Sequence, residues 1–409
     1  MKIIKYHIDK QCLKSFKLII LTVFFVSSFT GYSQIEKDST EQIDLPILLR
    51  KLFNVEESDS AKKKEKKVLL SILPAIGYTI QTGFTVDVIS NNAFQLGDKE
   101  NTNLSSVTFQ VELSQRKQLS MPFNIVIWSP ENKWNFVSDW RFLMYHQLNY
   151  GLGGSSLIED EIFINFNYLR VHQTAYREIA KNTYAGVGYN LDYHTKIRQT
   201  HIKDNEVNDF SEYGDPSKTL SSGFTLNGLF DKRKNSISPR HGEHYANVIY
   251  KNNFKQIGSS SDWSSLFIDL RTYFKLGKSP DNILAFWSYN QFVLGGTPPF
   301  LDLPSTGWDA YTNFARQYRQ GRYVGKSLLY LESEYRFKIS RNGFFNGSVF
   351  ANGHSVSEWS NNKFKHFIPG VGCSVRLKMN TDSDLNLVVS YGVAADGSQG
   401  FFFNLGEAF

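Results

Sequence analysis

The chain has 409 residues, a formal net charge of +6 and a high aromatic content of 33 Phe, 21 Tyr and 7 Trp. Residues 1–33 carry a net charge of +4, so the remainder is nearly neutral and lacks the basic surface of a nucleic-acid-binding protein. Cys12 and Cys373 are the two cysteines, and the nine histidines lack metal-ligand spacing. We therefore predict no disulfide, no metal site and no cofactor.

Residues 1–33 have the layout of a secretory signal peptide. A lysine-rich start precedes the apolar run Leu18–Phe29, and small and polar residues follow up to Ser33. The apolar run is too short to span a bilayer comfortably, so we expect cleavage near Ser33 rather than a membrane anchor. A lipoprotein acceptor cysteine would follow the apolar run, whereas Cys12 precedes it, so we expect no lipidation.

Residues 34–67 are expected to form a short periplasmic or plug segment and a linker, because they are too few for an independent domain. Asp44-Leu45-Pro46 predicts the start of a helix, with an acidic cap and a proline in the first turn. The lysine-rich stretch Ser58–Lys67 is expected to be solvated, with contact to acidic lipid headgroups as the less favoured alternative.

From Val68 to Phe409 the pattern is that of an all-β protein. Segments of roughly nine to fourteen residues alternate apolar with polar or small side chains, and Gly, Asn, Asp, Ser and Pro separate them. In Ser327–Ile339, for example, the charged residues from Glu332 to Lys338 face away from the leucines. We predict about sixteen strands, near 69–78, 82–95, 105–116, 119–129, 134–146, 162–177, 183–198, 221–233, 243–254, 263–276, 282–294, 326–339, 344–358, 365–379, 385–395 and 399–409.

The connections favour a membrane barrel over a soluble sandwich. Short turns alternate with three long loops, namely Gln147–Asp160, Gln199–Leu220 and Gly295–Gly325. Sorting of turns and loops to opposite ends is typical of a transmembrane barrel, where lipid meets the apolar face and every backbone group pairs within the sheet. We therefore predict a transmembrane antiparallel β-barrel over residues 68–409, with a secreted soluble β-protein as the alternative.

The loop Gly295–Gly325 is unusually long for a connection without its own secondary structure, and such loops are usually functional. Three prolines stiffen its first part, and it ends in a basic group, Arg316, Arg319 and Arg322. Aromatic residues recur along it: Phe300, Trp308, Tyr311 and Phe314. A freely exposed loop would be richer in Gly, Ser and Asn, so we expect this one to pack inside the barrel.

Three features of residues 68–409 carry a resemblance to a known family. The long loop falls between the eleventh and twelfth predicted strands, Ala315-Arg316-Gln317-Tyr318 is similar to a V-R-G-F/Y loop motif, and the chain ends in GSQGFFFNLGEAF. Together they resemble the bacterial surface antigen, or BamA/TamA-like, outer-membrane barrels. The resemblance implies a multi-pass outer-membrane protein that contacts outer-membrane lipid and acts in membrane biogenesis or translocation on an unknown protein substrate.

The resemblance also implies a loop anchor inside the lumen. The family's loop arginine packs against acidic residues of the next two strands, so Arg316 is expected to meet Glu332 or Glu334, with Tyr318 beside it. Two nearby carboxylates need a cation, and an arginine fork can hold one with two hydrogen bonds. Asn352 stands where the family often has an aspartate, and Gln317 replaces the motif glycine. Ordinary solvation of charges in a wet lumen is the alternative.

The C-terminal segment resembles the closing strand that targets such barrels to the outer-membrane assembly machinery. The residues that carry this resemblance alternate and are Phe401, Phe403, Leu405 and Phe409. The segment before Val68 has no room for a polypeptide-transport-associated (POTRA) domain, so a short barrel-only member is expected.

Two other function classes stay open. A passive or gated channel, plugged by residues 295–325, would have the same strand pattern. An outer-membrane hydrolase is disfavoured because Gly353-His354-Ser355-Val356-Ser357 lacks the last glycine of a nucleophile elbow and lies in a predicted strand. We therefore predict that the chain is not an enzyme.

Overall fold

The structure is a computed structural model that describes residues 42–45, 47–48, 68–79, 82–98, 100–200, 208–213, 216–309, 313–381 and 384–409. All of them belong to one compact unit, Gln42–Phe409. The predicted signal peptide at 1–33, nearly all of the predicted segment 34–67 and the loop residue Tyr311 lie outside the described residues.

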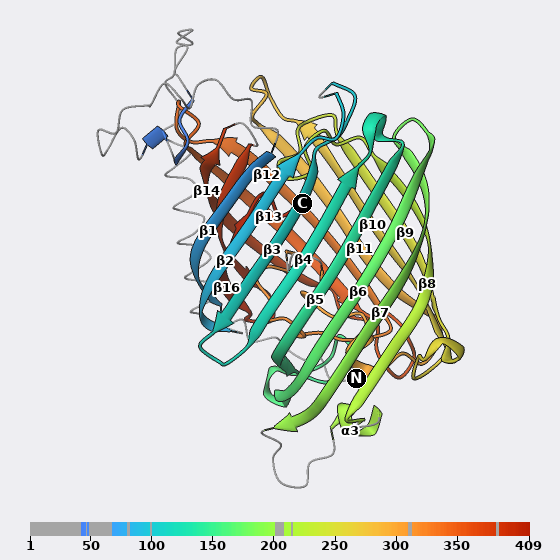
Figure 1. The fold of residues 1–409 in the computed structure, drawn as a ribbon. Coiled ribbons are helices and arrows are strands. Elements are labelled where there is room, and N and C mark those ends of the chain that lie inside the picture. The colour runs from blue at the N-terminus through green and yellow to red at the C-terminus, as the bar shows by residue number, and fades with distance from the viewer. Residues whose placement is uncertain are drawn as a thin grey trace. The chain divides into compact units, whose positions relative to one another are not determined.

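Sixteen antiparallel strands form one sheet, in which each strand pairs with the next along the chain (Figure 1). They are β1 (Val68–Thr79), β2 (Gly83–Phe94), β3 (Ser105–Ser114), β4 (Leu119–Trp128), β5 (Trp134–Asn149), β6 (Ile162–Ala180), β7 (Thr183–Thr200), β8 (Lys218–Asp231), β9 (His244–Asn253), β10 (Trp263–Lys275), β11 (Ile283–Gly296), β12 (Ser327–Lys338), β13 (Phe345–Val356), β14 (Ile368–Asn380), β15 (Leu385–Ala394) and β16 (Gln399–Leu405). The predicted all-β, sixteen-stranded antiparallel barrel is confirmed.

Short helices occur in the connections. They are η2 (Pro130–Asn132), η3 (Ile158–Asp160), α3 (Asp209–Tyr213), η4 (Lys255–Ile257) and η5 (Phe300–Asp302). No helix in the described part of the chain is long and apolar enough to cross a membrane.

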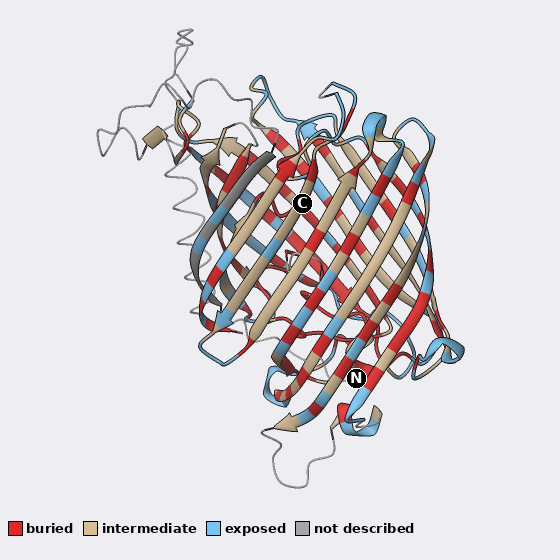
Figure 2. Cartoon of the chain, viewed as in Figure 1, coloured by how far each residue is buried: buried red, intermediate tan, exposed pale blue. Residues whose placement is uncertain are grey.

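Buried and exposed residues alternate along the strands, as the banding in Figure 2 shows, and the alternation separates an apolar outer face from a charged interior. In β12, Leu331 is 59% exposed, whereas its neighbours Glu332 and Glu334 are 3% and 2% exposed. In β10, Leu270 is exposed and Asp269 is buried. Apolar side chains outside and charges inside reverse the order of a soluble protein, and this arrangement suits a barrel surrounded by lipid.

The two ends of the sheet, β1 and β16, lie next to each other. Among the described residues no hydrogen-bonded ladder joins them, although a ladder joins every pair of strands that are consecutive in the chain. Pro74 stands within β1, and a proline in a strand has no N–H group to donate. The boundary between β1 and β16, which we call the seam, is therefore the least strongly paired part of the sheet.

The connections divide between two ends of the barrel. The three connections predicted to be long, 150–161, 201–217 and 297–326, share the long-loop end, and the turns 339–344 and 381–384 lie at the opposite, short-turn end. The connection 232–243 is also at the short-turn end, although it is longer than the turns predicted there. Its length has a structural reason, because the Ile237 carbonyl reaches the C-terminal segment and accepts a hydrogen bond from the Glu407 N–H group at 2.9 Å.

The described residues before β1 contact the short-turn end. Asp44 Oδ1 accepts a hydrogen bond from the Ile47 N–H group at 3.1 Å, which is the acidic helix start predicted from the sequence. Asp44 Oδ2 accepts two more, from the N–H and hydroxyl groups of Thr381, both at 3.1 Å. This segment is thus attached to the turn between β14 and β15.

Candidate functional site in the barrel lumen

The connection between β11 and β12, which we call the lumenal loop (residues 297–326), lies inside the barrel. None of its described residues from 298 to 325 is exposed. Its aromatic side chains pack on the inner wall, where Phe314 stacks on Tyr289 of β11 with ring centroids 4.7 Å apart. The predicted lumen-entering loop is confirmed.

Arg316 of this loop lies between two carboxylates. Its Nη2 donates hydrogen bonds to Glu332 and to Glu334, the latter at 2.8 Å, and its guanidinium carbon lies 4.0 Å from the ring centroid of Phe350. All three charged side chains are at most 5% exposed. Burial alone would lower the pKa of Arg316, but attraction to Glu332 and Glu334 outweighs burial and raises it. Arg316 is therefore charged, and the two carboxylates share its charge.

The turn around Arg316 is tight. Ala315 has a φ of 60°, which is uncommon for a residue with a side chain, and its carbonyl accepts a hydrogen bond from the Tyr318 N–H group at 2.9 Å. The Tyr318 hydroxyl donates to the Ile368 carbonyl at 3.1 Å, and its ring meets His354 edge-on, with centroids 4.5 Å apart. Tyr318 thus attaches the loop to β13 and β14, beside Arg316.

Gln317, which replaces the motif glycine, contacts Asn352, which stands where the family often has an aspartate. Asn352 Nδ2 donates to Gln317 Oε1 and to Glu332 Oε2, both at 3.0 Å, and Gln317 Nε2 donates back to Asn352 Oδ1. Glycines provide the space, because a Cβ atom on Gly370 would lie 1.9 Å from Gln317 Nε2 and one on Gly392 would lie 2.8 Å from Gln317 Cβ. The Gln317 side chain therefore fits because β14 and β15 have glycines, Gly370 and Gly392, at the positions next to it.

The other arginines of the loop reach other parts of the barrel. Arg319 Nη1 lies 2.8 Å from Glu161 Oε2, and both side chains are one-third exposed. Arg322 donates to the Ser156 hydroxyl at 3.0 Å and lies 3.3 Å from Asp396. The basic group predicted from the sequence is thus distributed over several walls.

The C-terminal segment departs from the prediction. The sequence predicts a final strand that runs to Phe409, but β16 ends at Leu405, and Gly406 takes a left-handed φ of 94°. The chain then enters the lumen, where Phe409 is 2% exposed and stacks on Trp287 with centroids 5.1 Å apart. Arg336 Nη2 donates to the Phe409 carbonyl oxygen at 2.8 Å. Phe409 therefore lies apart from the outward-facing strand residues.

The outward-facing part of the C-terminal pattern extends over β16. Phe401 and Phe403 are exposed on the outer face, and Leu405 is half-buried. The predicted period of two thus holds as far as Leu405. It stops at Gly406, because the left-handed backbone there turns the chain away from the sheet.

Residues 406–409, which we call the C-terminal tail, also contact the lumenal loop. Asn313 Nδ2 of the loop donates to the Ala408 carbonyl at 3.0 Å. The Glu407 carboxylate accepts hydrogen bonds from Arg376 of β14 and from Asn386 of β15, the latter at 2.7 Å. The tail thus connects β16, beside the seam, with the loop that fills the lumen.

A second set of lumenal charges follows a pattern that the sequence analysis did not use. An acidic residue precedes an arginine by two positions, and the two pair on the same strand face at 2.7–2.8 Å. The pairs are Asp139 with Arg141, Asp231 with Arg233, Asp269 with Arg271, and Glu334 with Arg336. Because residues two apart share a face of a strand, the repeated acid-x-Arg spacing was a readable signal for the lumenal face.

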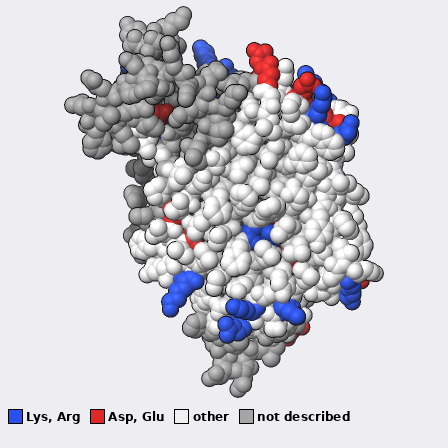
Figure 3. All heavy atoms as spheres, viewed as in Figure 1, with Lys and Arg blue, Asp and Glu red and all other residues white. Residues whose placement is uncertain are grey.

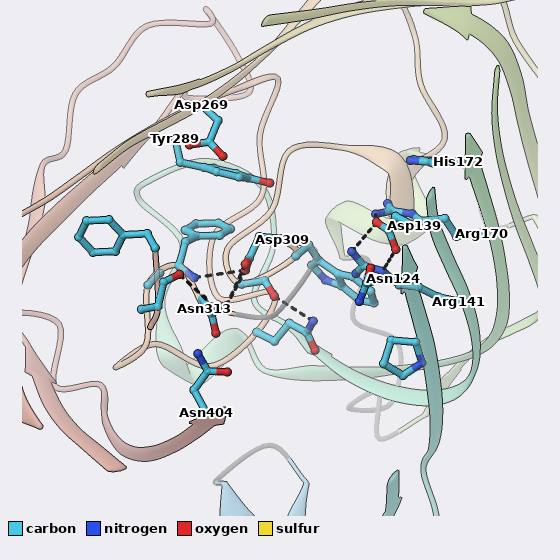
Figure 4. A pocket seen from close by; sticks show the side chains of 18 of the residues that line it. Asn124, Asp139, Arg141, Arg170, His172, Asp269, Tyr289, Asp309, Asn313 and Asn404 are labelled. Carbon is cyan, nitrogen blue, oxygen red and sulfur yellow. Dashed lines mark hydrogen bonds and ion pairs between the residues drawn. The ribbon is translucent and has the colours of Figure 1, made fainter. Parts of the chain in front are cut away.

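A cavity of about 760 Å³ remains beside the lumenal loop (Figure 4). Asp309 and Asn313 of the loop lie on one side of it, and Asp139, Arg141 and Arg170 lie on the other. Asp139 is paired with Arg141 at 2.7 Å and with Arg170 at 3.2 Å. Arg170 also pairs with Asp192 at 3.1 Å, so each of these three charges has an oppositely charged partner.

Asp302 of η5 contacts the barrel wall at β7 and β8. The Ser221 hydroxyl donates to it at 2.6 Å, and His194 Nδ1 lies 3.8 Å away. Burial, reinforced by the charge of Asp192, raises the pKa of Asp302 to about 7. Asp302 thus changes its charge within the physiological pH range.

The serine that approached a nucleophile-elbow motif has no catalytic geometry. Ser355 lies in β13, and its hydroxyl donates to the His366 carbonyl at 2.6 Å. A nucleophilic serine needs a sharp strand-to-helix turn and a neighbouring base. Among the described residues, no group of three or more His, Cys, Asp or Glu side chains is arranged to hold a metal ion.

Comparison with solved structures identifies the fold. BamA from Haemophilus ducreyi, in a crystal structure lacking POTRA domains 1–3, superposes with a TM-score of 0.53 and 13% identity, over 84% of this chain and 71% of that one. CdiB from Acinetobacter baumannii gives 0.52 and 12%, over 83% and 60%. CdiB from Escherichia coli gives 0.52 and 9%, over 84% and 68%.

At these identities the likeness concerns the fold, and the predicted resemblance to a BamA-like barrel is confirmed at that level. No protein-family model matches the sequence, and no curated protein matches it.

Proposed function

We propose that this chain is an integral outer-membrane barrel that acts, without enzymatic chemistry, in outer-membrane biogenesis or protein translocation. Its fold is that of the BamA and CdiB barrels. The apolar outer face and charged interior support a location in lipid. Members of the family that the sequence resembles insert or secrete proteins, and this activity is the one we assign.

The observation that carries the proposal is that specific contacts hold the lumenal loop and the C-terminal tail inside the barrel. The lumenal loop is held by the buried ion pairs of Arg316, and the C-terminal tail contacts both the loop and Arg336. Burying charged side chains in the lumen carries a desolvation penalty, and a passive pore would gain nothing in return for it. A barrel that must hold its lumen closed until a substrate arrives gains a defined resting state.

The seam gives such a barrel a lateral route. A strand edge without a ladder leaves backbone groups unpaired, and in lipid each unpaired group costs several kcal/mol. The pairing that β1 and β16 lack could be supplied by the backbone of a substrate strand. Because the C-terminal tail continues from β16, movement of this strand would also disturb the contact between Asn313 and Ala408.

The second candidate is a gated channel plugged by the lumenal loop. The cavity of about 760 Å³ favours it, since a modest displacement of the loop would enlarge an existing space. The two candidates differ in the substance that the barrel transports and in the route that this substance takes. The channel passes small solutes through the lumen, whereas the assembly barrel handles polypeptide.

Two measurements separate these candidates. In planar bilayers, the purified protein is expected to give small, flickering conductance, and Arg316→Ala is expected to enlarge it. Arg319→Ala, which breaks a one-third-exposed pair at the long-loop end, is expected to leave it unchanged. In cells, deletion of the gene is expected to lower the amount of other folded outer-membrane or surface proteins, scored by their heat-modifiable mobility.

Large, steady pores from the unmodified protein, together with an unchanged outer-membrane protein profile after deletion, would instead establish the channel. Complementation with the Arg316→Ala variant is a further arm. If the anchoring of the lumenal loop by Arg316 matters for assembly, this variant should only partly restore viability or the levels of the other outer-membrane proteins. This should hold even when the variant itself is present at the normal amount.

A further inference from the structure

Three basic side chains meet on the outer face of the barrel at its long-loop end. Lys196 and Arg198 lie near the end of β7, and Lys218 begins β8; all three are exposed. Lys218 pairs across the strands with Thr195, which precedes Lys196 and lies three residues before Arg198. Figure 3 shows several Lys and Arg side chains along this end, which carries α3, with a few acidic side chains near them.

A β-bulge places two of these side chains on the outer face. Even-numbered residues of β7, such as Asp192 and His194, face the lumen, so regular alternation would turn Lys196 and Arg198 inward as well. Instead, the register shifts between β6 and β7, and Lys196 takes a left-handed φ of 54°. Ile197 then becomes the buried residue and packs in the apolar cluster that includes Phe300. Bulges at barrel rims commonly re-aim side chains in this way.

None of the three forms an ion pair with any residue that the structure describes, a range that omits 201–207 and 214–215. Lys133 at the short-turn end, by contrast, is exposed but paired with Glu131 at 2.7 Å. Below the basic cluster the outer face becomes apolar, with Phe224 and Leu226 of β8 exposed. The cluster thus stands where the apolar band ends, at the level of lipid headgroups.

We propose that Lys196, Arg198 and Lys218 form a docking surface for the phosphate groups of lipid headgroups in the leaflet at the long-loop end. Phosphate oxygens suit this cluster because an arginine fork binds them with two hydrogen bonds and lysines add point charges. Cations at this level gain from an anionic surface. The inference rests on the proposed outer-membrane location, in which the long loops face outward, but not on any transport activity.

The test measures lipid binding to purified protein in a neutral detergent by native mass spectrometry. The probe is a short-chain phosphatidic acid, with the matching phosphatidylcholine and inorganic phosphate as separate arms. The triple variant Lys196→Gln, Arg198→Gln and Lys218→Gln is expected to bind phosphatidic acid about ten- to hundred-fold more weakly than the unmodified protein. The difference should shrink with rising salt, because exposed charges are screened.

A matched control removes the same charge at the short-turn end, through Lys181→Gln, Lys275→Gln and Lys278→Gln, and should leave the affinity unchanged. Folding of both triple variants is checked by heat-modifiable mobility; if the first fails to fold, single Arg198→Gln and Lys218→Gln variants replace it and should each weaken binding about three-fold or more. Equal binding by the cluster variant and the control overturns the proposal. So does an equally strong response to inorganic phosphate, which would mean a site for free anion.

Discussion

Asn352 and Gln317 hold each other's amide groups inside the barrel, with Asn352 Nδ2 donating to Gln317 Oε1 at 3.0 Å and Gln317 Nε2 donating back. Gln317 stands where the loop motif of the family that the sequence resembles has glycine, and Asn352 stands where that family often has an aspartate. The departures are complementary, because one amide replaces a glycine where the other replaces an acid. Gly370 and Gly392 leave the space that the longer side chain needs.

This packing predicts that Gly370→Ala destabilises the barrel and that Gln317→Gly reverses much of the loss. The new methyl group would meet Gln317 Nε2 at 1.9 Å, and overpacking of a close-packed interior typically costs about 1–3 kcal/mol. The free energy of unfolding of each variant is measured in urea with the barrel in lipid vesicles. Gly228→Ala is the matched control, because a Cβ atom at Gly228 meets nothing within 4 Å.

If Gly370→Ala costs no more than Gly228→Ala, or if Gln317→Gly does not rescue it, Gln317 is not seated between β14 and β15. In that case the loop motif would be held by Arg316 and Tyr318 alone.

A second prediction concerns Arg316 and its two carboxylates. Breaking a buried pair leaves an uncompensated charge, so Arg316→Ala is expected to cost about 3–5 kcal/mol. Arg319→Ala breaks the pair with Glu161, in which both side chains are one-third exposed, and should cost only about 0–1 kcal/mol. Unfolding free energies of the two single variants, measured side by side, check this difference.

Double-mutant cycles with Glu332→Gln and Glu334→Gln then show which carboxylate holds the arginine. Since Arg316 Nη2 contacts both, we expect coupling above about 0.5 kcal/mol in each cycle. Couplings near zero in both would mean that the loop is retained in the lumen by its aromatic packing instead.

The strands could be predicted well from the sequence. Lipid outside and charge inside impose a strict period of two, so segments such as 326–339 were recognisable as β12 (Ser327–Lys338) from their alternation. The position of the lumenal loop followed from its length and composition. The acid-x-Arg pairs, such as Asp269 with Arg271, were equally visible because they depend on spacing within one strand.

Contacts between distant segments could not be predicted in the same way. The partner of Gln317 lies 35 residues away on another strand, and nothing local specifies that pairing. The course of the C-terminal tail was not predictable either, because the alternation of Phe401, Phe403 and Leu405 suggests a strand that continues to Phe409. The interruption depends on the left-handed conformation of Gly406, a residue type that permits this turn without requiring it.

A third prediction is that the first part of the lumenal loop is held more tightly at acidic pH. Burial raises the pKa of Asp302 from 3.8 to about 7, with Asp192 adding to the shift and Lys251 and Arg170 opposing it. Because the folded state binds this proton more strongly than the unfolded chain, the stabilisation is complete below about pH 3.8 and is lost as the pH rises through about 7.

The prediction is checked by unfolding in urea at pH 5.5 and at pH 8.5. Stability should fall over this interval with a slope of at most about 1.4 kcal/mol per pH unit from this group. Asp302→Asn should flatten the dependence, since the amide still accepts a hydrogen bond from Ser221 but does not titrate. An unchanged pH profile in Asp302→Asn would assign any dependence to other groups, such as His194 nearby.

The last prediction concerns Phe409, for which sequence and structure imply different roles. As the end of a targeting strand, Phe409 would be recognised during insertion and would matter little afterwards. In the structure it is buried against Trp287 and Arg336, and removal of a buried phenylalanine side chain costs about 3–5 kcal/mol. We therefore expect Phe409→Ala to weaken purified, refolded barrel by an amount in this range.

Phe403→Ala is the control for Phe409→Ala, because Phe403 is exposed on the outer face of β16. In a lipid-free refolding assay in detergent, Phe403→Ala should change the unfolding free energy by less than about 0.5 kcal/mol. If Phe409→Ala leaves the stability of the refolded protein intact and lowers only its insertion in cells, Phe409 acts as a targeting residue. If instead Phe409→Ala lowers the unfolding free energy and raises the pore conductance, the main contribution of Phe409 is to hold the C-terminal tail against the lumenal loop. Defective insertion would then follow from defective folding.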